Sequence, residues 1–257
     1  GIYPMEPYAQ DPPVIHAFEP WSGHYNVRKA LWGYAHYGQF TQTGWNYLQG
    51  GCIQLEGGGS MVTLVSPDRK DYSIIIETKG VKETKKVTIS LKGGMPEKSL
   101  CVWQSDSSAQ FVRQEDIKPE KQSINLTLKP NTVYSLSTTR GQQKGTFSNI
   151  PQSKAFPFPY CENFEEYGNP KERGYLPRYT ADISGAFEIT DRPDGKGKCM
   201  QQKVEIPAIS WAPDWNPYTI YGDSAWKDYE VSADIKLNSG DAAAVMGRIC
   251  DVGSGYG

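Results

Sequence analysis

The chain has 257 residues, of which 38% are hydrophobic and 22% are charged, so it can bury a core and is not a disordered tail. Its net charge of −2 gives no electrostatic reason to expect nucleic acid or an anionic membrane surface as a partner. No apolar run is long enough to span a bilayer, and the 26 glycines and 18 prolines favour short strands joined by turns.

The first segment of the chain predicts a loop followed by a helix. Residues 1–28 are punctuated by prolines, which disfavour helix at their own position and at the preceding one. Residues 29–40 have helical periodicity, and Gly44 follows as a stop signal. One face of this helix carries Leu31, Tyr34, Ala35 and Gly38. We interpret His36, inside the helix, as a hydrogen-bonded structural residue and not as a catalytic one.

From about residue 45 to residue 141 the hydrophobic pattern changes to period two, which is typical of strands with one buried face. The apolar runs are short and are bounded by glycine, proline, serine and aspartate. They lie at 52–56, 61–65, 72–77, 87–91, 100–102, 124–128 and 133–136. About seven short strands at near-regular spacing predict an antiparallel β-sandwich.

A proline-rich linker and a second β-rich region follow. Residues 142–159 contain three prolines that would stiffen a linker. From residue 160 the clearest predicted strands are 186–189, 200–206 and 229–237. This region predicts an incomplete sheet, because a strand such as 242–249 needs neighbours on both sides.

The cysteines do not predict a metal centre. None of the five is spaced as CxxC, which argues against a zinc site. An odd number does not suit a closed disulfide framework, so we interpret them as buried or free thiols. One or two disulfides in a secreted parent protein stay open as the alternative. The five are Cys52, Cys101, Cys161, Cys199 and Cys250.

Three sets of residues occur in one order along almost the whole chain. The first is Glu19-Pro20-Trp21-Ser22-Gly23-His24-Tyr25, followed by Trp32, His36, Gln39-Phe40-Thr41-Gln42 and Gly44-Trp45. The second is Ile74-Ile75-Ile76-Glu77-Thr78, and the third is Ile209-Ser210-Trp211-Ala212, Gly222-Asp223, Trp226 and Gly247-Arg248. Together they resemble glycoside hydrolase family 59, the galactosylceramidase family. The helix segment is also similar to the glucosylceramidase-type family.

The resemblance implies a mainly β chain that is a C-terminal fragment of a longer enzyme. Residues 1–44 would be the C-terminal end of a (β/α)8 glycosidase barrel, as its loop and last helix. Residues 45–141 would be an antiparallel β-sandwich and residues 142–159 a linker. Residues 160–257 would be a truncated lectin-like β-sandwich of the concanavalin or laminin-G type.

The activity implied by the resemblance is that of a retaining β-galactosidase acting on galactosyl lipids or related β-galactosides. Such enzymes need a nucleophile and an acid/base carboxylate about 5 to 5.5 Å apart. The family carries both on earlier barrel strands, so we expect them upstream of Gly1, no catalytic residue in this chain and no cofactor for catalysis. Glu6, Asp11 and Glu19 are the carboxylates nearest the barrel end. They share one proline-rich loop with no strand to fix their separation, so we do not expect two of them to form the catalytic pair. The resemblance also implies a secreted, periplasmic or lysosomal parent.

Four aromatic or imidazole side chains are the candidates for substrate contact. Trp21 comes first, because an aromatic face stacks on the C–H-rich face of a sugar and the resemblance implies a place in the galactose site. Trp211 is second, since it matches a tryptophan that reaches the active site from the lectin-like domain. His24 and Tyr25 could bond sugar hydroxyls or catalytic carboxylates, and hydrogen bonding within the loop stays open as the alternative.

The resemblance also implies a structural calcium site and one departure from the family. Asn163 and Glu165, with a backbone carbonyl near Lys198, match part of a calcium site, although calcium takes six to eight oxygens. The family's usual aspartate is Asn163 here, so one negative charge is lost. Residues 79–85 form a short loop without the arginine that reaches the galactose pocket in the family.

Two competing interpretations remain at this stage. A non-catalytic carbohydrate-binding protein of two β-sandwiches would have no use for the helix at 29–40. A glucosylceramidase-like glycoside hydrolase would end after the first sandwich. Without the upstream barrel we expect the helix to expose Leu31, Trp32 and Tyr34, and the chain alone to be poorly soluble.

Overall fold

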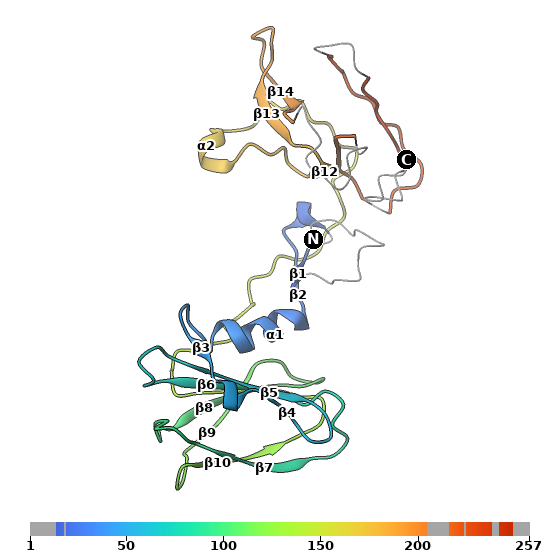
Figure 1. Cartoon of the computed structure of the whole chain (residues 1–257). Helices are drawn as coiled ribbons and strands as arrows, with labels where there is room; N and C mark the ends of the chain where they lie inside the picture. The colour runs from blue at the N-terminus through green and yellow to red at the C-terminus, as the bar shows by residue number, and fades with distance from the viewer. Residues whose placement is uncertain (1–13, 18, 205–215, 224, 238–241, 249–257) are drawn as a thin grey trace. The chain divides into compact units, whose positions relative to one another are not determined.

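The computed structural model describes residues 14–17, 19–204, 216–223, 225–237 and 242–248, which group into two compact units (Figure 1). The two-sheet unit comprises residues 27–148. The bipartite unit combines the described residues up to Asn26 with those from Asn149 onward. The helix at 29–40, which was expected to close a barrel, therefore groups with the sheets that follow it. The boundary between the two units falls inside the expected linker at 142–159, before Asn149.

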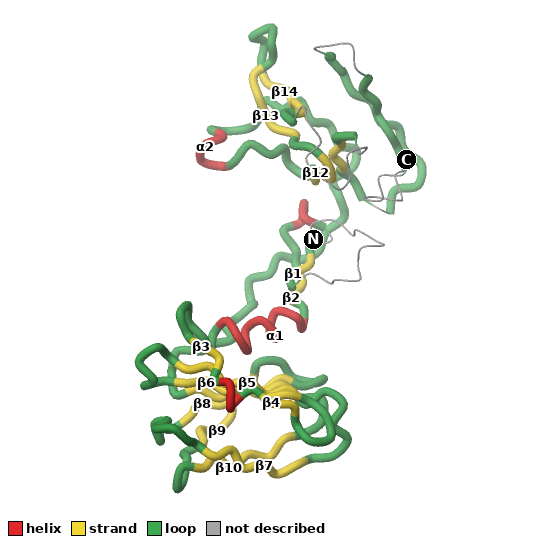
Figure 2. The backbone as a smooth tube through the Cα atoms, in the orientation of Figure 1, coloured by secondary structure: helices red, strands yellow, loops and turns green. Residues whose placement is uncertain are grey.

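The two-sheet unit is built from antiparallel strands, as Figure 2 shows in yellow. The larger sheet has the order β3-β5-β6-β11-β8-β9, with β4 also paired to β5, and β7 pairs with β10 in a second sheet. Its elements are α1 (Lys29–Gly38), β3 (Asn46–Tyr47), the 3-10 turn η3 (Gln49–Gly51), β4 (Ile53–Gln54), β5 (Ser60–Val65), β6 (Tyr72–Glu77), β7 (Lys85–Ser90), β8 (Leu100–Ser105), β9 (Val112–Ile117), β10 (Ser123–Leu128) and β11 (Val133–Ser137). The predicted mainly β, antiparallel fold is confirmed.

An aliphatic core fills the space between the two sheets. Successive side chains of a strand point to opposite faces, so Ile74 and Ile76 of β6 and Leu136 of β11 point inward together. Their exposed fractions are at most 1%. The buried members are Met61, Val65, Tyr72, Ile74, Ile76, Leu91, Met95, Leu100, Val102, Ile124, Leu128, Tyr134 and Leu136.

The other face of the larger sheet is covered by helix α1. The alternate residues of β6 and β11 on this face include Ser73, Ser135 and Ser137, all 0% exposed. Aromatic and sulfur-containing side chains pack beside them: Trp32, Phe40, Cys101, Trp103 and Phe111. The central strands β6, β11 and β8 are therefore buried on both faces, with an aliphatic layer on one and serines with aromatic rings on the other.

The buried face of α1 differs from the predicted one. Trp32 and His36 are the buried residues of the helix, whereas Tyr34 is 71% exposed. The expected exposure of Trp32 is wrong, because its indole stacks on the Phe111 ring with centroids 5.6 Å apart and an interplanar angle of 19°. Spacing alone could not choose the face, since the serine-bearing surface that receives the helix does not appear apolar in the sequence.

The described residues of the bipartite unit form short elements. They are β1 (Ile15–His16), the 3-10 turn η2 (Pro20–Ser22), β2 (Asn26–Val27) at the boundary, α2 (Pro170–Arg173), β12 (Ala181–Ser184), β13 (Phe187–Asp191), β14 (Lys198–Gln202) and β15 (Tyr218–Ile220). β12 pairs with β15 and β13 with β14, both antiparallel. The predictions of strands at 229–237 and 242–249 are wrong for the described residues, which end at 248. No ladder of backbone hydrogen bonds joins these residues to a described neighbour.

Two global features complete the description. Among the described residues, every helix is too short or too polar to cross a bilayer. Cys52, Cys101, Cys161 and Cys199 carry free thiols, as expected, and Cys250 lies outside the described residues.

Candidate functional site

The candidate substrate loop, residues 19–25, is a tight turn ordered by its own polar groups. The backbone N–H of Ser22 donates to the carbonyl of Glu19 at 2.9 Å, and its hydroxyl donates to the same carbonyl at 2.6 Å. The Ser22 hydroxyl in turn accepts from the backbone N–H of His24 at 3.0 Å. Gly23 has a φ of +73°, and a Cβ there would lie 3.4 Å from the Pro151 ring. The loop is thus closely apposed to the segment that begins at Pro151.

Trp21 lies in this loop with its polar edge occupied. Its indole Nε1–H donates to the carbonyl of Lys154 at 2.7 Å. Its ring meets the Phe156 ring edge-on, with centroids 5.0 Å apart and an interplanar angle of 67°. The side chain is half-buried. Trp21 is therefore hydrogen-bonded at Nε1 and in ring contact with Phe156.

His24 also contacts this segment through one of its two nitrogens. Its Nδ1 lies 2.8 Å from the carbonyl oxygen of Pro151. A carbonyl only accepts, so Nδ1 must carry the hydrogen, and a neutral ring then has Nε2 as its acceptor nitrogen. Nε2 could accept a hydrogen bond from a sugar hydroxyl. Tyr25, which follows, is half-buried.

Of the carboxylates weighed as catalytic, only Glu19 lies within the described residues. Its Oε2 accepts a hydrogen bond from the hydroxyl of Ser153. Glu6, Asp11 and the second candidate aromatic residue, Trp211, lie outside the described part of the chain. Residues 151–156 thus contact three side chains of the substrate loop, those of Glu19, Trp21 and His24.

Phe156 is at the centre of an aromatic cluster in the bipartite unit, and the sequence did not reveal it. Its ring is 4% exposed. Ring centroids of four residues besides Trp21 lie between 5.1 and 6.4 Å from it: Trp226, Tyr160, Tyr179 and Tyr221. Its backbone N–H donates to the carboxylate of Asp223 at 3.4 Å. The first and third sets of resemblance residues therefore meet at Phe156.

The predicted calcium residues are neighbours in the structure. The side-chain oxygen of Asn163 accepts from the backbone N–H of Glu165 at 3.1 Å, and Oε1 of Glu165 accepts from the backbone N–H of Lys198 at 2.8 Å. Two candidate oxygens therefore already accept protein hydrogen bonds. Within the described residues no three histidine, cysteine, aspartate or glutamate side chains gather to hold a metal ion. These donors alone do not fit the six to eight oxygens that calcium takes.

Glu162 is a second feature that the sequence did not reveal. Its Oε2 accepts from the hydroxyls of Tyr160 and Tyr167 at 2.9 and 2.8 Å, and its Oε1 accepts from the Phe164 N–H at 2.8 Å. Burial alone would raise the pKa of this carboxyl, but these hydrogen bonds and the Arg178 guanidinium lower it overall. Glu162 is thus an ionised, hydrogen-bonded carboxylate beside the aromatic cluster.

Comparison with known proteins now identifies the central part of the chain. Residues 47–143 match the family model described as the glycosyl hydrolase family 59 central domain. Residues 47–143 are therefore similar to this domain, and for that similarity the segment is called the family 59 central domain. The chain is similar over 91% of its length to the galactocerebrosidase of Danio rerio, at 32% identity, and over 92% to that of Homo sapiens, at 31%. It spans only 38% of either relative.

A solved structure is similar over a smaller part of the chain. A GH30 endoxylanase from Clostridium papyrosolvens superposes on 43% of this chain and 28% of its own, with a TM-score of 0.37 and 12% identity. That likeness is too low to support a conclusion about the family 59 central domain. The assignment of residues 47–143 depends on sequence similarity.

The buried histidine of α1 contacts the family 59 central domain. The Ser135 hydroxyl donates to the carbonyl of His36 at 2.9 Å, so Nδ1 of His36, 2.8 Å from that hydroxyl oxygen, must donate to it. Nε2 then accepts from the Ser105 hydroxyl at 2.8 Å. Burial lowers the pKa of His36 to about 4, so the ring stays neutral. The interpretation of His36 as a structural residue is confirmed.

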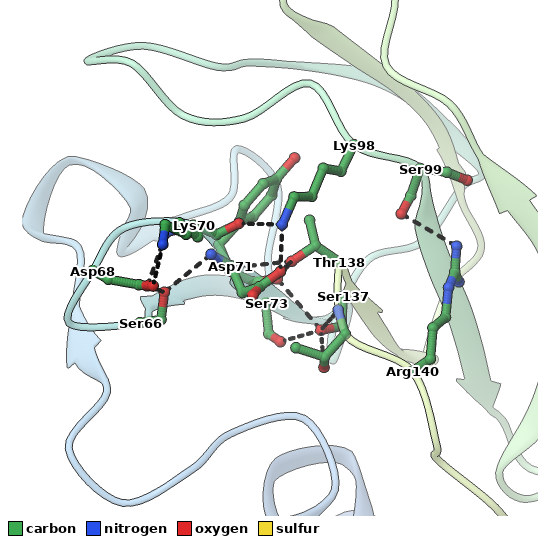
Figure 3. A network of polar contacts seen from close by, with 12 residues as sticks. Ser66, Asp68, Lys70, Asp71, Ser73, Lys98, Ser99, Ser137, Thr138 and Arg140 are labelled. Carbon is green, nitrogen blue, oxygen red and sulfur yellow. Dashed lines mark hydrogen bonds and ion pairs between the residues drawn. The ribbon is translucent and has the colours of Figure 1, made fainter.

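A polar network surrounds the β5–β6 turn of the family 59 central domain (Figure 3). Asp71 accepts from the Thr138 hydroxyl at 2.8 Å and from Lys98 Nζ at 3.0 Å. The bond from Thr138 is the main cause that lowers the pKa of the Asp71 carboxyl, with Lys98 contributing less. The hydroxyl of Ser66 donates to Asp68 at 2.7 Å. The network ties the turn to the residue that follows β11 and is a structural contact.

The short loop after β6 is a tight turn in the structure. Thr78 is 0% exposed, donates to the Lys129 carbonyl at 2.7 Å and accepts from the Thr132 N–H at 2.8 Å. The Lys79 N–H donates to the Glu77 carboxylate at 2.7 Å, and Gly80 has a φ of +83°. This family 59 central domain therefore has a compact turn where the sequence lacks the expected arginine.

Proposed function

We propose that this chain is the C-terminal portion of a retaining β-galactosidase of the galactosylceramidase type. It would take part in hydrolysis of the β-galactosidic bond of galactosyl lipids or related β-galactosides. The observation that carries the proposal is 32% identity to a galactocerebrosidase over 91% of this chain, well beyond the family 59 central domain. Similarity over 91% of the chain, of which residues 47–143 are only a part, supports a relationship that extends beyond the shared domain.

The proposed architecture assigns residues 1–44 to the end of a (β/α)8 barrel and residues 160–257 to a lectin-like sandwich. The catalytic carboxylates would come from an upstream barrel of the same parent protein, because 38% coverage of the relatives leaves room for one. A retaining enzyme needs two carboxylates about 5 to 5.5 Å apart. Glu19 is the one described carboxylate in the substrate loop, and it accepts from Ser153.

Within this chain, the proposed role is recognition of the sugar. The indole face of Trp21 would stack on the galactose ring, while Nε2 of His24 would bond a hydroxyl. Tyr25 and Trp211 complete the proposed set. The compact turn at Gly80 carries no arginine, so recognition would differ there from the family pattern. Asn163 and Glu165 have no proposed role in binding calcium, because the oxygens described there do not fit the ion.

The test is hydrolysis of chromogenic β-galactoside and β-glucoside by this 257-residue chain and by a protein extended upstream through a full barrel. We expect β-galactoside hydrolysis by the extended protein only. Activity of the chain alone would place a carboxylate pair inside it and contradict the proposal. Preference for the glucoside would favour the glucosylceramidase-like alternative. Sugar binding without any hydrolysis would favour the non-catalytic carbohydrate-binding alternative.

A further inference from the structure

The segment 151–156 contacts the candidate substrate loop at successive positions. The pairs are the Pro151 carbonyl with His24 Nδ1, the Ser153 hydroxyl with the Glu19 carboxylate, the Lys154 carbonyl with Trp21 Nε1, and the Phe156 ring with the Trp21 ring. Three of these four use a side chain of the loop and a backbone or short polar group of the segment. The fourth joins two rings, so it alone depends on one large side chain of the segment.

Phe156 is held on its other sides by residues from much later in the chain. Trp226 meets it edge-on at 5.1 Å and 85°, and Tyr179 does so at 5.4 Å and 72°. The Trp226 ring in turn packs against Gly222, where a Cβ would lie 2.8 Å from the indole. Phe156 therefore has little freedom to move without displacing rings of the 160–229 region, and Trp21 packs on it.

We propose that Phe156 is a positioning residue that sets which face and angle of Trp21 is presented to the sugar. This inference rests on the proposed function. The hydrogen bond from Nε1 to the Lys154 carbonyl fixes one edge of the indole. The edge-to-face contact with Phe156, at 5.0 Å and 67°, sets the tilt of the ring relative to the aromatic cluster. The aromatic cluster thereby controls the geometry of sugar stacking without touching the sugar.

The nearby Phe158 provides a matched control. Its ring lies 5.2 Å from the Trp226 ring and is 60% exposed. Phe158→Leu and Phe156→Leu make the same chemical change two residues apart in the same segment. Leucine at position 156 keeps an apolar group in the buried site but removes the ring edge. A difference between the two variants therefore reports the loss of the buried ring at position 156, and the double-mutant cycle with position 21 assigns the part that acts through Trp21.

The experiment measures kcat and KM for a chromogenic β-galactoside in the parent protein that contains this chain, with a double-mutant cycle between positions 21 and 156. We expect Phe156→Leu to raise KM about 10-fold with kcat nearly unchanged, and Phe158→Leu to leave both near wild type. Phe156→Tyr, which retains the ring, should restore most of the loss. In a Trp21→Ala background, Phe156→Leu should have no further effect, because the residue acts through Trp21.

A second readout does not need activity. The emission of Trp21, taken as the difference between wild type and Trp21→Phe, should become more accessible to acrylamide in Phe156→Leu and unchanged in Phe158→Leu. Unaltered KM and unaltered Trp21 emission in Phe156→Leu, with an active wild-type protein, would overturn the positioning role alone. An inactive wild-type parent protein would instead overturn the proposed function, so the two failures are distinguishable.

Discussion

The two units of this chain are stabilised in different ways. In the two-sheet unit the central strands of the larger sheet are covered on both faces, and side chains such as Leu100, Ile124 and Leu136 are 0% exposed. In the described part of the bipartite unit the strands have two to five residues. Phe156, at 4% exposure, is the centre of a ring cluster there. The described residues of the candidate site all belong to the bipartite unit.

This difference separates stability from recognition. An aliphatic core is non-directional and tolerates many arrangements, whereas edge-to-face rings and hydrogen-bonded carboxylates fix orientation. The bipartite unit orients Trp21 and His24 by directional contacts of this second kind. We therefore expect the two units to respond to different substitutions.

The largest expected effect is in the aliphatic core. Leu136→Ala should cost about 3 kcal/mol of the two-sheet unit's free energy of unfolding, since it removes a buried side chain and leaves a cavity. Leu176→Ala in the bipartite unit, where the side chain is 60% exposed, should cost less than about 0.5 kcal/mol. Denaturant melting with a separate Trp21 emission signal checks both. The comparison fails if Leu136→Ala shifts the Trp21 transition equally.

The next effect sharpens the comparison through pH. Burial lowers the pKa of His36 in the folded state to about 4, whereas the ordinary pKa of histidine is 6.5. Between these values the unfolded state binds more protons, so the stability from neutral His36 is present above pH 6.5 and is lost as pH falls toward 4. The two-sheet unit should lose roughly 3 kcal/mol over this window. The midpoint of unfolding as a function of pH measures it.

The control variants divide this pH dependence by unit. His36→Gln should lower stability at neutral pH but remove the slope between pH 6.5 and 4 in the two-sheet unit. His24→Gln, in the bipartite unit, should leave that slope in place. A slope that persists in His36→Gln would show that other groups produce it.

The strands of the two-sheet unit could largely be predicted from period-two runs, whereas β9 could not. β9 has the sequence Val-Arg-Gln-Glu-Asp-Ile and lies at one end of the strand order. Its outer backbone edge has no neighbouring strand, and edge strands of this kind often carry charged side chains in place of an apolar pattern. The opposite error occurs at 229–237, where apolar alternation does not make a strand. Val231 and Ile235 are 41% and 51% exposed there.

Candidate site residues could be named from the sequence only where a resemblance supplied them. Trp21 and His24 were proposed in that way and their roles stay predictions, whereas Phe156 and Glu162 carry no local signal. The hydrogen bond from Trp21 spans 133 residues of sequence, and periodicity reports only neighbours a few residues apart. Ser73 and Ser135 show the same limit, because small polar residues on alternate positions indicate a solvent face until α1 is known to cover them.

A smaller effect is expected from the carboxylate beside the aromatic cluster. Glu162→Gln should cost the bipartite unit about 2 kcal/mol, because the hydroxyls of Tyr160 and Tyr167 lose a charged acceptor. The lowered pKa of Glu162 means that this stability is present above the usual glutamate pKa and is lost as pH falls below it. Thermal melting at pH 7 and pH 4 measures both statements.

Glu166→Gln is the matched control for Glu162. Its side chain is 79% exposed and its carboxylate lies 3.7 Å from the same Arg178. This substitution should change stability by less than about 0.5 kcal/mol. Equal effects of the two substitutions would mean that the charge near Arg178, and not the bonds from the two tyrosines, stabilises this region.

The smallest expected effect lies in the polar network of the two-sheet unit (Figure 3). Lys98→Met removes an ion pair to Asp71, and the two side chains are 48% and 33% exposed, respectively. The loss of unfolding free energy should be less than about 0.5 kcal/mol at low salt. In 1 M NaCl, where the charges are screened, no loss should be measurable. Thr138→Val removes the hydroxyl whose bond to the carboxylate most lowers the pKa of Asp71. Because the hydroxyl carries no net charge, the loss of about 1 kcal/mol should be similar at either salt concentration. Denaturant melting at both salt concentrations separates the two contacts. A larger, salt-sensitive loss in Lys98→Met would show that charge pairing also stabilises the two-sheet unit, and the contrast between an apolar unit and a directionally bonded one would then no longer hold.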